Sequence, residues 1–453
     1  MVDRRQRRRR CIRRRIGRVS IYLHHGAWWV YYRENDKPVR RHVGSDERAA
    51  ERIAAEVNSQ LTSDAPTLFT FMPVTVSELR DRFLKYHREV LGSSIETVNR
   101  YRTATQHLID YLGGLGRDLK AQDLSVAAFI TFMRQRLVSP NGHSNTKKRK
   151  LRGKGLRFVL EVCRSLFAYA AKNRHLPPYA ANPFATIQLD RMRNEDAKPI
   201  FVFSEQQAVA FLKSASEWAF PIHCLLLLTG ARPGELCHLL IEDVRLEEGW
   251  LTVCNKTELG WRIKTGRERS IPLVTEGRAV LQRVIAARKV GPIFLRPRFG
   301  CLGTHRSGLD RCAMGRLLDE RLHQAGSAAS EPVSAEQHQK IADGVWRDVG
   351  TVDPDRIRTS FIRISRHCGL SQSTCPKSWR HTFATLLQDA NVDPLIRQIT
   401  MGHQPRGASG ALGMTAVYTH TRPATHLREI DRALRTWPTV LELAAQWAQG
   451  GVQ

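Results

Sequence analysis

Residues 225–239, LLLLTGARPGELCHL, decide the fold of the C-terminal half of the chain. The leucines indicate a buried helix, and Pro233 suits the first position of a second helix. Arg232 therefore stands at a junction between two helices. Such a junction can hold a guanidinium group in one orientation, which bidentate recognition of a phosphate requires.

Four other segments of this half carry side chains suited to phosphate chemistry. Lys264 ends a predicted strand at a tight turn in KTGRERSIPL, and His403 follows a predicted helix in MGH. Lys377 and Arg380 in PKSWRHTFATLL are three residues apart, so they share a helix face and repel each other unless an anion neutralises them. Tyr418 in TAVYTH is a phenol with apolar neighbours. Each residue alone also has an ordinary structural interpretation, such as a core tyrosine or a surface arginine.

The region around these segments is predicted to have mixed secondary structure. Its strand-like segments predict a small antiparallel sheet of three successive strands, Trp250–Asn255, Trp261–Lys264 and Ser270–Leu273. Most of the remainder has helical periodicity, beginning at Ser204. Residues 325–355 are polar and aperiodic, and we expect an inserted loop there.

The charge of the whole chain favours a polyanionic partner. Its 453 residues include 71 Lys and Arg against 43 Asp and Glu, a net charge of +28. This balance indicates nucleic acid first and an anionic membrane surface second. No apolar run approaches the ~18 residues of a membrane span. The first eighteen residues hold ten Arg and one Asp, which is not typical of a secretory signal, so we expect a cytoplasmic, nucleoid-associated protein.

The N-terminal part divides into a basic arginine-rich arm, residues 1–20, and a small module, residues 21–66. The β-branched and aromatic residues of the module predict two or three short strands. A helix follows, with Ala49, Ile53 and Val57 at helical spacing. We interpret the module as a DNA-binding unit. The simpler alternative is a solvated extension with a packed aromatic hairpin.

Residues 70–185 predict a compact domain of four helices. Thr75 and Ser94 are capping residues of the first two helices, and apolar periodicity marks the others near residues 125–137 and 156–172. Between the third and fourth helices lies a dense basic run that suits contacts with DNA phosphates: Lys147, Lys148, Arg149, Lys150, Arg152 and Lys154. A solvated surface is the structural alternative for such a run.

The nine cysteines contain no C-x-x-C pair, so we expect reduced thiols. Cys301, His305 and Cys312 are the one cluster that resembles a metal site, and it lacks a clear fourth ligand. We therefore expect no metal and no cofactor.

The motifs TGARPGEL, KTGRERSIPL, RHTFATLL, MGH and VYTH resemble, in this order, the five signatures of the tyrosine recombinase family, the integrases of phages and mobile elements. The resemblance spans residues 204–429 and implies a mixed α/β catalytic domain over residues 195–445. The four-helix segment resembles the core-binding domain of that family, and the N-terminal module resembles its arm-binding module. The implied fold is multidomain and mainly α, with a small antiparallel sheet in the catalytic domain and a small α+β N-terminal module.

The resemblance also implies roles for the motif residues. Arg232 and Arg380 match the arginines that hold the non-bridging oxygens of the scissile phosphate, and Tyr418 matches the nucleophile. Lys264 matches the lysine that protonates the leaving 5′-oxygen as general acid. Lys256 is an alternative general acid in a poorer strand context.

Two further positions depart from the commoner family pattern. Lys377 stands where the family carries His or Lys, which leaves open which group takes the proton of the tyrosine. His403 stands at the place of His or Trp, and its separation from Tyr418 is longer than usual.

These roles imply a site-specific DNA recombinase, an integrase that cuts and rejoins DNA strands through a 3′-phosphotyrosine intermediate and integrates or excises a mobile element. The implied partners are double-stranded DNA attachment sites, a homotetramer on DNA and DNA-bending accessory proteins. Two alternatives have other activities: a type IB topoisomerase-like enzyme that relaxes DNA, and a DNA-binding regulator.

Apolar residues at helical spacing continue after Tyr418, from Leu427 to Trp447. They predict a C-terminal helix that either closes the core of its own domain or docks onto a neighbouring protomer, and we favour docking.

Overall fold

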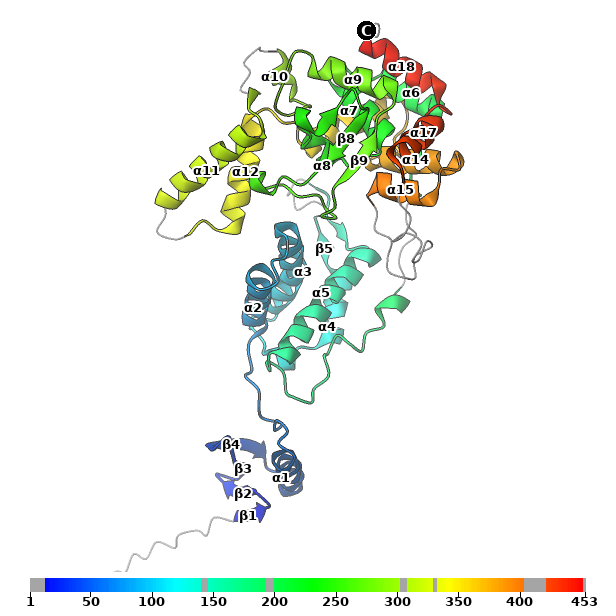
Figure 1. Ribbon diagram of the computed structural model, residues 1–453. Coiled ribbons are helices and arrows are strands. Elements are labelled where there is room, and N and C mark those ends of the chain that lie inside the picture. The colour runs from blue at the N-terminus through cyan, green and yellow to red at the C-terminus, as the bar shows by residue number, and fades with distance from the viewer. Residues whose placement is uncertain are drawn as a thin grey trace, which may run out of the picture. The chain divides into compact units, whose positions relative to one another are not determined.

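The computed structural model describes residues 13–139, 146–192, 199–301, 308–328, 332–402 and 421–450. The chain divides into two units, residues 1–197 and residues 198–453. Helices predominate in both units and the sheets are small and antiparallel, so the predicted mainly α, multidomain fold is confirmed (Figure 1). Within the described ranges, no helix is both long enough and apolar enough to cross a membrane.

The first unit begins with a four-stranded antiparallel meander and one helix. Its elements are β1 (Arg13–Ile16), β2 (Val19–His24), β3 (Ala27–Glu34), β4 (Lys37–Gly44) and α1 (Glu47–Thr62). Alternate residues of β3, among them Val30 and Tyr32, are buried against Ala54 and Val57 of α1. The sheet thus has four strands where we predicted two or three, because Arg13–Ile16, expected to belong to the arm, pairs with β2.

The remainder of this unit contains the four helices predicted from periodicity. They are α2 (Val76–Glu89), α3 (Ile95–Gly114), α4 (Val126–Gln135) and α5 (Gly153–Lys172), with short 3₁₀ helices η1 (Ala121–Asp123) and η2 (Leu189–Arg191). Thr75 and Ser94 cap α2 and α3 as expected. A two-stranded ribbon of β5 (Leu137–Val138) and β6 (Arg149–Lys150) lies between α4 and α5, so part of the basic run is a strand.

The second unit surrounds a short sheet with helices. Its N-terminal elements are α6 (Glu205–Lys213), α7 (Ala219–Thr229), α8 (Pro233–Cys237), η3 (Ile241–Asp243), β7 (Val244–Arg245), β8 (Trp250–Val253), η4 (Thr257–Leu259), β9 (Arg269–Pro272) and α9 (Thr275–Ile285). Its C-terminal elements are α10 (Pro297–Cys301), α11 (Arg311–Ala328), α12 (Ala335–Asp348), α13 (Pro354–His367), α14 (Lys377–Asp389), α15 (Pro394–Met401), α17 (Pro423–Leu434) and α18 (Pro438–Ala448). Helix α7 is buried over its whole length, so residues 225–228, all leucine, lie in the core of this unit.

The predicted strand at Trp261–Lys264 is wrong. The sheet consists of β7, β8 and β9, and Trp261 forms only an isolated bridge with Lys256. The amide of Ile263 donates instead to the side-chain oxygen of Asn255. The backbone of this segment therefore forms a loop that hydrogen-bonds to a side chain, although its apolar residues have a strand-like pattern.

The predicted loop over residues 325–355 is also wrong, because α11 and α12 form a helical hairpin there (yellow in Figure 1). Ser334 begins α12 with a capping box. Ala342, Val345 and Trp346 then lie on one face of α12 and join Met314 in a separate small core. The apolar face is narrow, and this is why the segment looked aperiodic.

The C-terminal helix α18 packs on its own unit, against our expectation that it docks onto a neighbouring protomer. Leu441, Leu443 and Trp447 are buried in the main core of this unit. The Trp447 ring stacks on Phe220 with 5.1 Å between the ring centres. The helix therefore closes the core of its own domain.

Candidate active site and nucleic-acid interfaces

Arg232 lies at the junction predicted from the sequence. It has an extended backbone immediately before α8, and Pro233 begins the helix. Its guanidinium donates to Glu235 Oε1 at 2.7 Å, and its amide donates to Glu235 Oε2 at 2.9 Å. The Arg232 side chain remains 22% exposed, so one carboxylate orients a guanidinium that solvent can still reach.

Glu235 also binds a second arginine that sequence reasoning missed. Arg269 of β9 donates to both carboxylate oxygens, at 3.1 and 2.6 Å, and the pair is almost completely buried. Burial raises the pKa of Glu235, but the hydrogen bonds and charges of Arg269 and Arg232 outweigh burial and hold that pKa below its ordinary value. The position of Glu235 three residues after Arg232, where a helix favours an acidic capping residue, was the available sequence signal.

Arg380 reaches the same place from α14. Its guanidinium donates to the carbonyl oxygen of Gly230 at 2.7 Å and to that of Met401. Gly230 ends α7 with a φ of +60°, and a Cβ there would lie 2.3 Å from the Phe383 ring, so glycine is required at this contact. Arg232 and Arg380, 148 residues apart in the sequence, are thus brought together by the first turn of α14 and the end of α7.

The paired arginines make the site strongly positive. Burial is the main cause that lowers the pKa of Arg380, to about 9, and the charge of Arg232 lowers it further. The guanidinium therefore stays charged at neutral pH. Three arginines, Arg232, Arg269 and Arg380, face one carboxylate, and an anion such as a phosphate would offset the remaining repulsion.

The two candidate general acids differ sharply in environment. Lys264 is exposed in a turn that Gly266 closes by donating its amide to the carbonyl of Ile263 at 2.8 Å. Lys256 is 1% exposed, and its ammonium lies 2.8 Å from Asp243 and over the Trp261 ring. Only Lys264 of these two can approach a large substrate without breaking a buried ion pair.

Lys377 and Arg380 both lie in the first turn of α14, as the sequence predicted, but they differ in burial. Lys377 is exposed, whereas Arg380 is 8% exposed. Burial lowers the pKa of the adjacent His381, and the charges of Arg380 and Lys377 lower it further. The Lys377 ammonium therefore adds to the positive charge of this turn and acts electrostatically on His381.

His403 and Tyr418 lie outside the described residues, but the chain on either side of their segment is held beside the arginines. Before it, the carbonyl of Thr400 accepts from Arg269 Nε at 2.9 Å, and Gly402 ends α15. After it, His426 of α17 shares a 2.7 Å hydrogen bond with the Thr400 hydroxyl. Thr400 therefore joins Arg269 to α17, the first described helix after residue 420.

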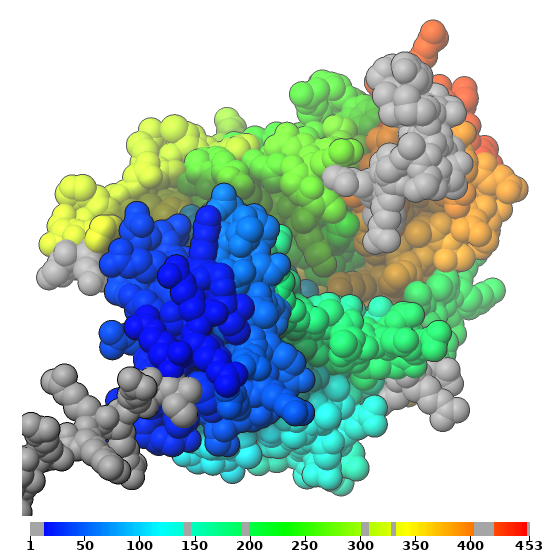
Figure 2. Space-filling view, turned by 90° about the horizontal axis from the view of Figure 1, so that it is seen from below, coloured from blue at the N-terminus to red at the C-terminus, as the bar shows by residue number. Residues whose placement is uncertain are grey.

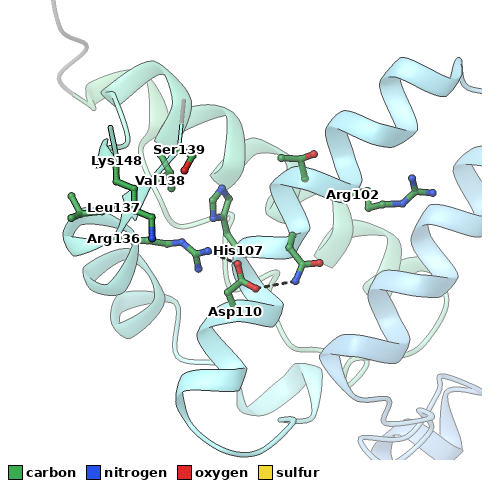
Figure 3. Close-up of a pocket in the computed structure, with 10 residues that line it drawn as sticks. Arg102, His107, Asp110, Arg136, Leu137, Val138, Ser139 and Lys148 are labelled. Carbon is green, nitrogen blue, oxygen red and sulfur yellow. Dashed lines mark hydrogen bonds and ion pairs between the residues drawn. The ribbon is translucent and has the colours of Figure 1, made fainter. Parts of the chain in front are cut away.

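The basic run between α4 and α5 is exposed at all six predicted residues. Lys148 borders a cavity of 490 Å³ that is also lined by Arg102, Arg136 and His107, with Asp110 at its centre (Figure 3). Burial raises the pKa of Asp110, but hydrogen bonds from Gln106 and Arg136 outweigh this and lower it. The cavity is therefore mixed in charge, and Lys148 of the run lies exposed at its border.

The N-terminal sheet has a second cationic surface, on the face opposite α1. One row of neighbouring residues across the strands is Arg15, Ser20, Tyr31 and Arg40, and the next is Arg13, Tyr22, Trp29 and His42. Arg13 and Arg40 lie over the Tyr31 ring, 5.9 and 5.7 Å from its centre. Neither row contains a carboxylate, and the first strands lie open on the surface of the module (dark blue in Figure 2).

Most of the cysteine cluster falls outside the described residues. His305 lies outside the described residues, as does the side chain of Cys301, and Cys312 is a free, exposed thiol. Among the residues that the structure describes, no three His, Cys, Asp or Glu side chains converge as metal ligands.

Comparisons with known proteins identify relatives of this chain. Residues 190–311 match the model of the phage integrase family. The transposase from transposon Tn916 of Enterococcus faecalis is 24% identical over 235 residues, which is 49% of this chain and 49% of the transposase. The chain thus spans about half the length of that relative. The tyrosine recombinase XerC of Thermodesulfovibrio yellowstonii is 23% identical over 60% of this chain and 72% of the relative. Among solved structures, a lambda integrase tetramer bound to a Holliday junction has 16% identity and a TM-score of 0.48, over 85% of this chain and 95% of that one.

Proposed function

Because the chain belongs to the tyrosine recombinase family, as the match to its phage integrase model shows, we propose that it is a site-specific DNA recombinase. It cuts and rejoins DNA strands through a 3′-phosphotyrosine intermediate and thereby integrates or excises a mobile element. The observation that carries this proposal is the convergence of Arg232 and Arg380 on one partly open, positively charged site.

This convergence suits a phosphodiester in particular. The diester carries one negative charge that repels a nucleophile, and the transition state places more charge on the non-bridging oxygens. Arg232, held by Glu235, and Arg380, held by the carbonyls of Gly230 and Met401, are oriented before substrate arrives. Such preorganised donors stabilise the charge as it develops. His403 follows Gly402 in the chain, and we assign it as a third donor to the same oxygens.

We assign Tyr418 as the nucleophile. A phenol has an ordinary pKa of about 10, and a cationic site reduces the cost of removing its proton. Its oxygen attacks phosphorus, the bond from phosphorus to the 5′-oxygen breaks, and Lys264 gives a proton to that leaving oxygen. The proton of the tyrosine passes to water as the oxygen attacks, and we assign Lys377, a cation in the first turn of α14, to stabilise the negative charge at the site. A second 5′-hydroxyl reverses the step and rejoins the strands without an external energy source.

The exposure of Lys264 and the burial of Lys256 against Asp243 support Lys264 as the general acid. A suicide substrate made from the DNA junctions flanking the gene tests the nucleophile. Tyr418→Phe should retain DNA binding and form no covalent adduct, whereas the parent protein should form one. An adduct with the variant would show that another residue attacks.

We further propose two DNA-binding surfaces outside this site. The basic run, Lys147 to Lys154, contacts the backbone near the cleavage site, and the carboxylate-free face of the N-terminal sheet binds a separate DNA arm. A sheet can place its strands in a groove of DNA and contact the bases there. Exposed arginines that bind phosphates displace counterions from the DNA, which makes the affinity depend on salt. Deleting residues 1–66 should weaken binding to long DNA and flatten its salt dependence while cleavage at a core site persists. Unchanged affinity for long DNA would exclude the arm-binding role.

The proposed organisation has an arm over residues 1–20, an arm-binding module over 21–66, a core-binding domain over 70–185 and a catalytic domain over 195–445. The proposed partners are double-stranded attachment sites, three further copies of the chain in a tetramer on DNA, and DNA-bending proteins. We place the protein in the cytoplasm, at the nucleoid.

A topoisomerase-like activity uses the same chemistry, so it must be tested directly. Plasmid without attachment sites should be relaxed poorly, and plasmid carrying two sites should be recombined. Efficient relaxation that is independent of sequence would replace the recombinase proposal.

A further inference from the structure

Lys264 lies in a loop that joins β8 to β9, residues 254–268, and Asn255 organises this loop. The side-chain oxygen of Asn255 accepts from the amide of Ile263 at 2.9 Å, and its side-chain nitrogen donates to the carbonyl of Gly266 at 3.0 Å. Ile263 and Gly266 are the two ends of the turn whose central residues are Lys264 and Thr265. One amide side chain therefore holds both ends of the turn that carries the lysine.

The backbone of Asn255 is itself fixed from both sides. Its amide donates to Glu268 Oε1 at 2.9 Å, on the far side of the turn. Its carbonyl accepts from Arg311 Nη2 of α11 at 3.0 Å, and the same guanidinium binds Glu258. Asn255 thus connects the Lys264 turn to the helical hairpin of α11 and α12.

The hairpin makes a second attachment to the same loop. The Trp346 indole of α12 donates to the carbonyl of Leu259 at 2.9 Å, and both residues are buried in the small core of the hairpin. Gly260 lies so close to α12 that a Cβ would come within 2.5 Å of the Ala342 methyl group. The loop is therefore packed against α12.

From these contacts we propose that Asn255 is a positioning residue for Lys264, and that Arg311 of the hairpin keeps Asn255 in place. The inference rests on the proposed general-acid role of Lys264. The lysine side chain has four rotatable bonds, and proton transfer needs its nitrogen within about 2.6–3.2 Å of the leaving oxygen. Fixing the backbone of the turn restricts the region that the ammonium can reach, and a displacement of about 1 Å can cost two orders of magnitude in rate.

The test compares two leaving groups on one DNA sequence. The ordinary substrate expels a 5′-oxygen, which needs a proton. A substrate with a 5′-bridging sulfur expels a thiolate, which needs none. We measure single-turnover cleavage of both by the full chain, by Lys264→Ala, by Asn255→Ala and by Arg311→Met. Thr252→Ala is the matched control, because Thr252 also pairs with β9 while its hydroxyl bonds to that of Ser270 at 3.4 Å, outside the turn that carries Lys264.

We expect Asn255→Ala to slow cleavage of the ordinary substrate about 10- to 100-fold, Arg311→Met to slow it less, and Thr252→Ala to leave it unchanged. On the sulfur substrate all of these variants should cleave at the parent rate, because DNA binding and nucleophilic attack are intact. Thermal unfolding of each variant shows that any loss is not due to misfolding.

Three results would overturn the inference. If Asn255→Ala loses activity equally on both substrates while Lys264→Ala is rescued by sulfur, Asn255 acts through DNA binding or stability and the general acid stands. If Asn255→Ala is fully active on the ordinary substrate, the turn needs no such support. If Lys264→Ala itself is not rescued, the general-acid assignment fails and the role of Asn255 fails with it.

Discussion

Replacing Glu235 with Ala should destabilise the second unit and disorganise the arginine cluster of the proposed active site together. The change leaves Arg269, whose side chain is 3% exposed, without the carboxylate that accepts two of its hydrogen bonds. Charged hydrogen bonds contribute about 1.5–3 kcal/mol each, so two of them amount to roughly 3–6 kcal/mol. Breaking a buried ion pair from one side typically costs ~3–5 kcal/mol, because the remaining charge stays buried and unpaired. We therefore expect a loss of about 3–5 kcal/mol in the free energy of unfolding.

The assay is a double-mutant cycle followed by urea unfolding. Arg269→Met alone should also be destabilising, since the buried carboxylate then loses two charged hydrogen bonds and keeps those from Arg232. The double variant Glu235→Ala/Arg269→Met should lose clearly less than the sum of the single losses, because neither charge is left alone. A matched surface pair, Arg245 and Glu248, should give a coupling below about 1 kcal/mol. Additive losses at Glu235 and Arg269 would refute the claim that this pair stabilises the site.

Three further outcomes follow from the described contacts. Gly230→Ala should lower the free energy of unfolding by more than the ~1–2 kcal/mol of a left-handed backbone alone, because its Cβ would clash with Phe383. Gly369 has a similar φ and open space around it, so Gly369→Ala should show only that backbone cost. Equal losses of the two variants in urea unfolding would exclude the clash. Burial lowers the pKa of His223 to about 3. The unfolded imidazole gains its proton at a pH of about 6.5, so the free energy of unfolding should fall as the pH drops from there toward 3. His223→Phe should flatten this dependence, and an unchanged slope of melting temperature against pH would contradict the prediction. Trp447→Ala should cost ~3–5 kcal/mol in a monomeric chain at any protein concentration, and a loss that appears only at high concentration would mean that α18 docks between protomers.

The four helices of residues 70–185 could be predicted because their apolar residues recur every three to four positions and their caps are local. The N-terminal sheet was underestimated, since β1 is built from arginines and its partner strand supplies the pairing. The hairpin of α11 and α12 was missed because its apolar faces are narrow and pack on Leu240 and Leu259, outside the segment itself. A helix can be predicted from its local sequence only where its apolar face includes enough residues to stand out among the polar residues around it.

The motifs placed Arg232, Lys264 and Arg380 in the sequence, and the structure adds what touches them. Nothing in the wording of the motifs shows that Glu235 reaches Arg269, 34 residues away, or that Asn255 closes the turn of Lys264. These are contacts between side chains and distant backbone, which no periodicity encodes. Contacts between residues far apart in the sequence therefore account for most features of the site that could not be predicted from the sequence.

Among the residues that the structure describes, the buried hydrophobic side chains form four separate clusters. The N-terminal sheet, the four helices, the main body of the second unit and the hairpin of α11 and α12 each have their own. The N-terminal module closes its core with α1 and with the chain just after it, where Phe69 packs on the core and the Thr67 hydroxyl shares a hydrogen bond with that of Tyr32. With these residues included, it contains what it needs to fold as an exchangeable part. Fusing a foreign module to the chain after residue 70 would then leave the second unit unchanged and, under the proposed function, would direct it to a different DNA sequence.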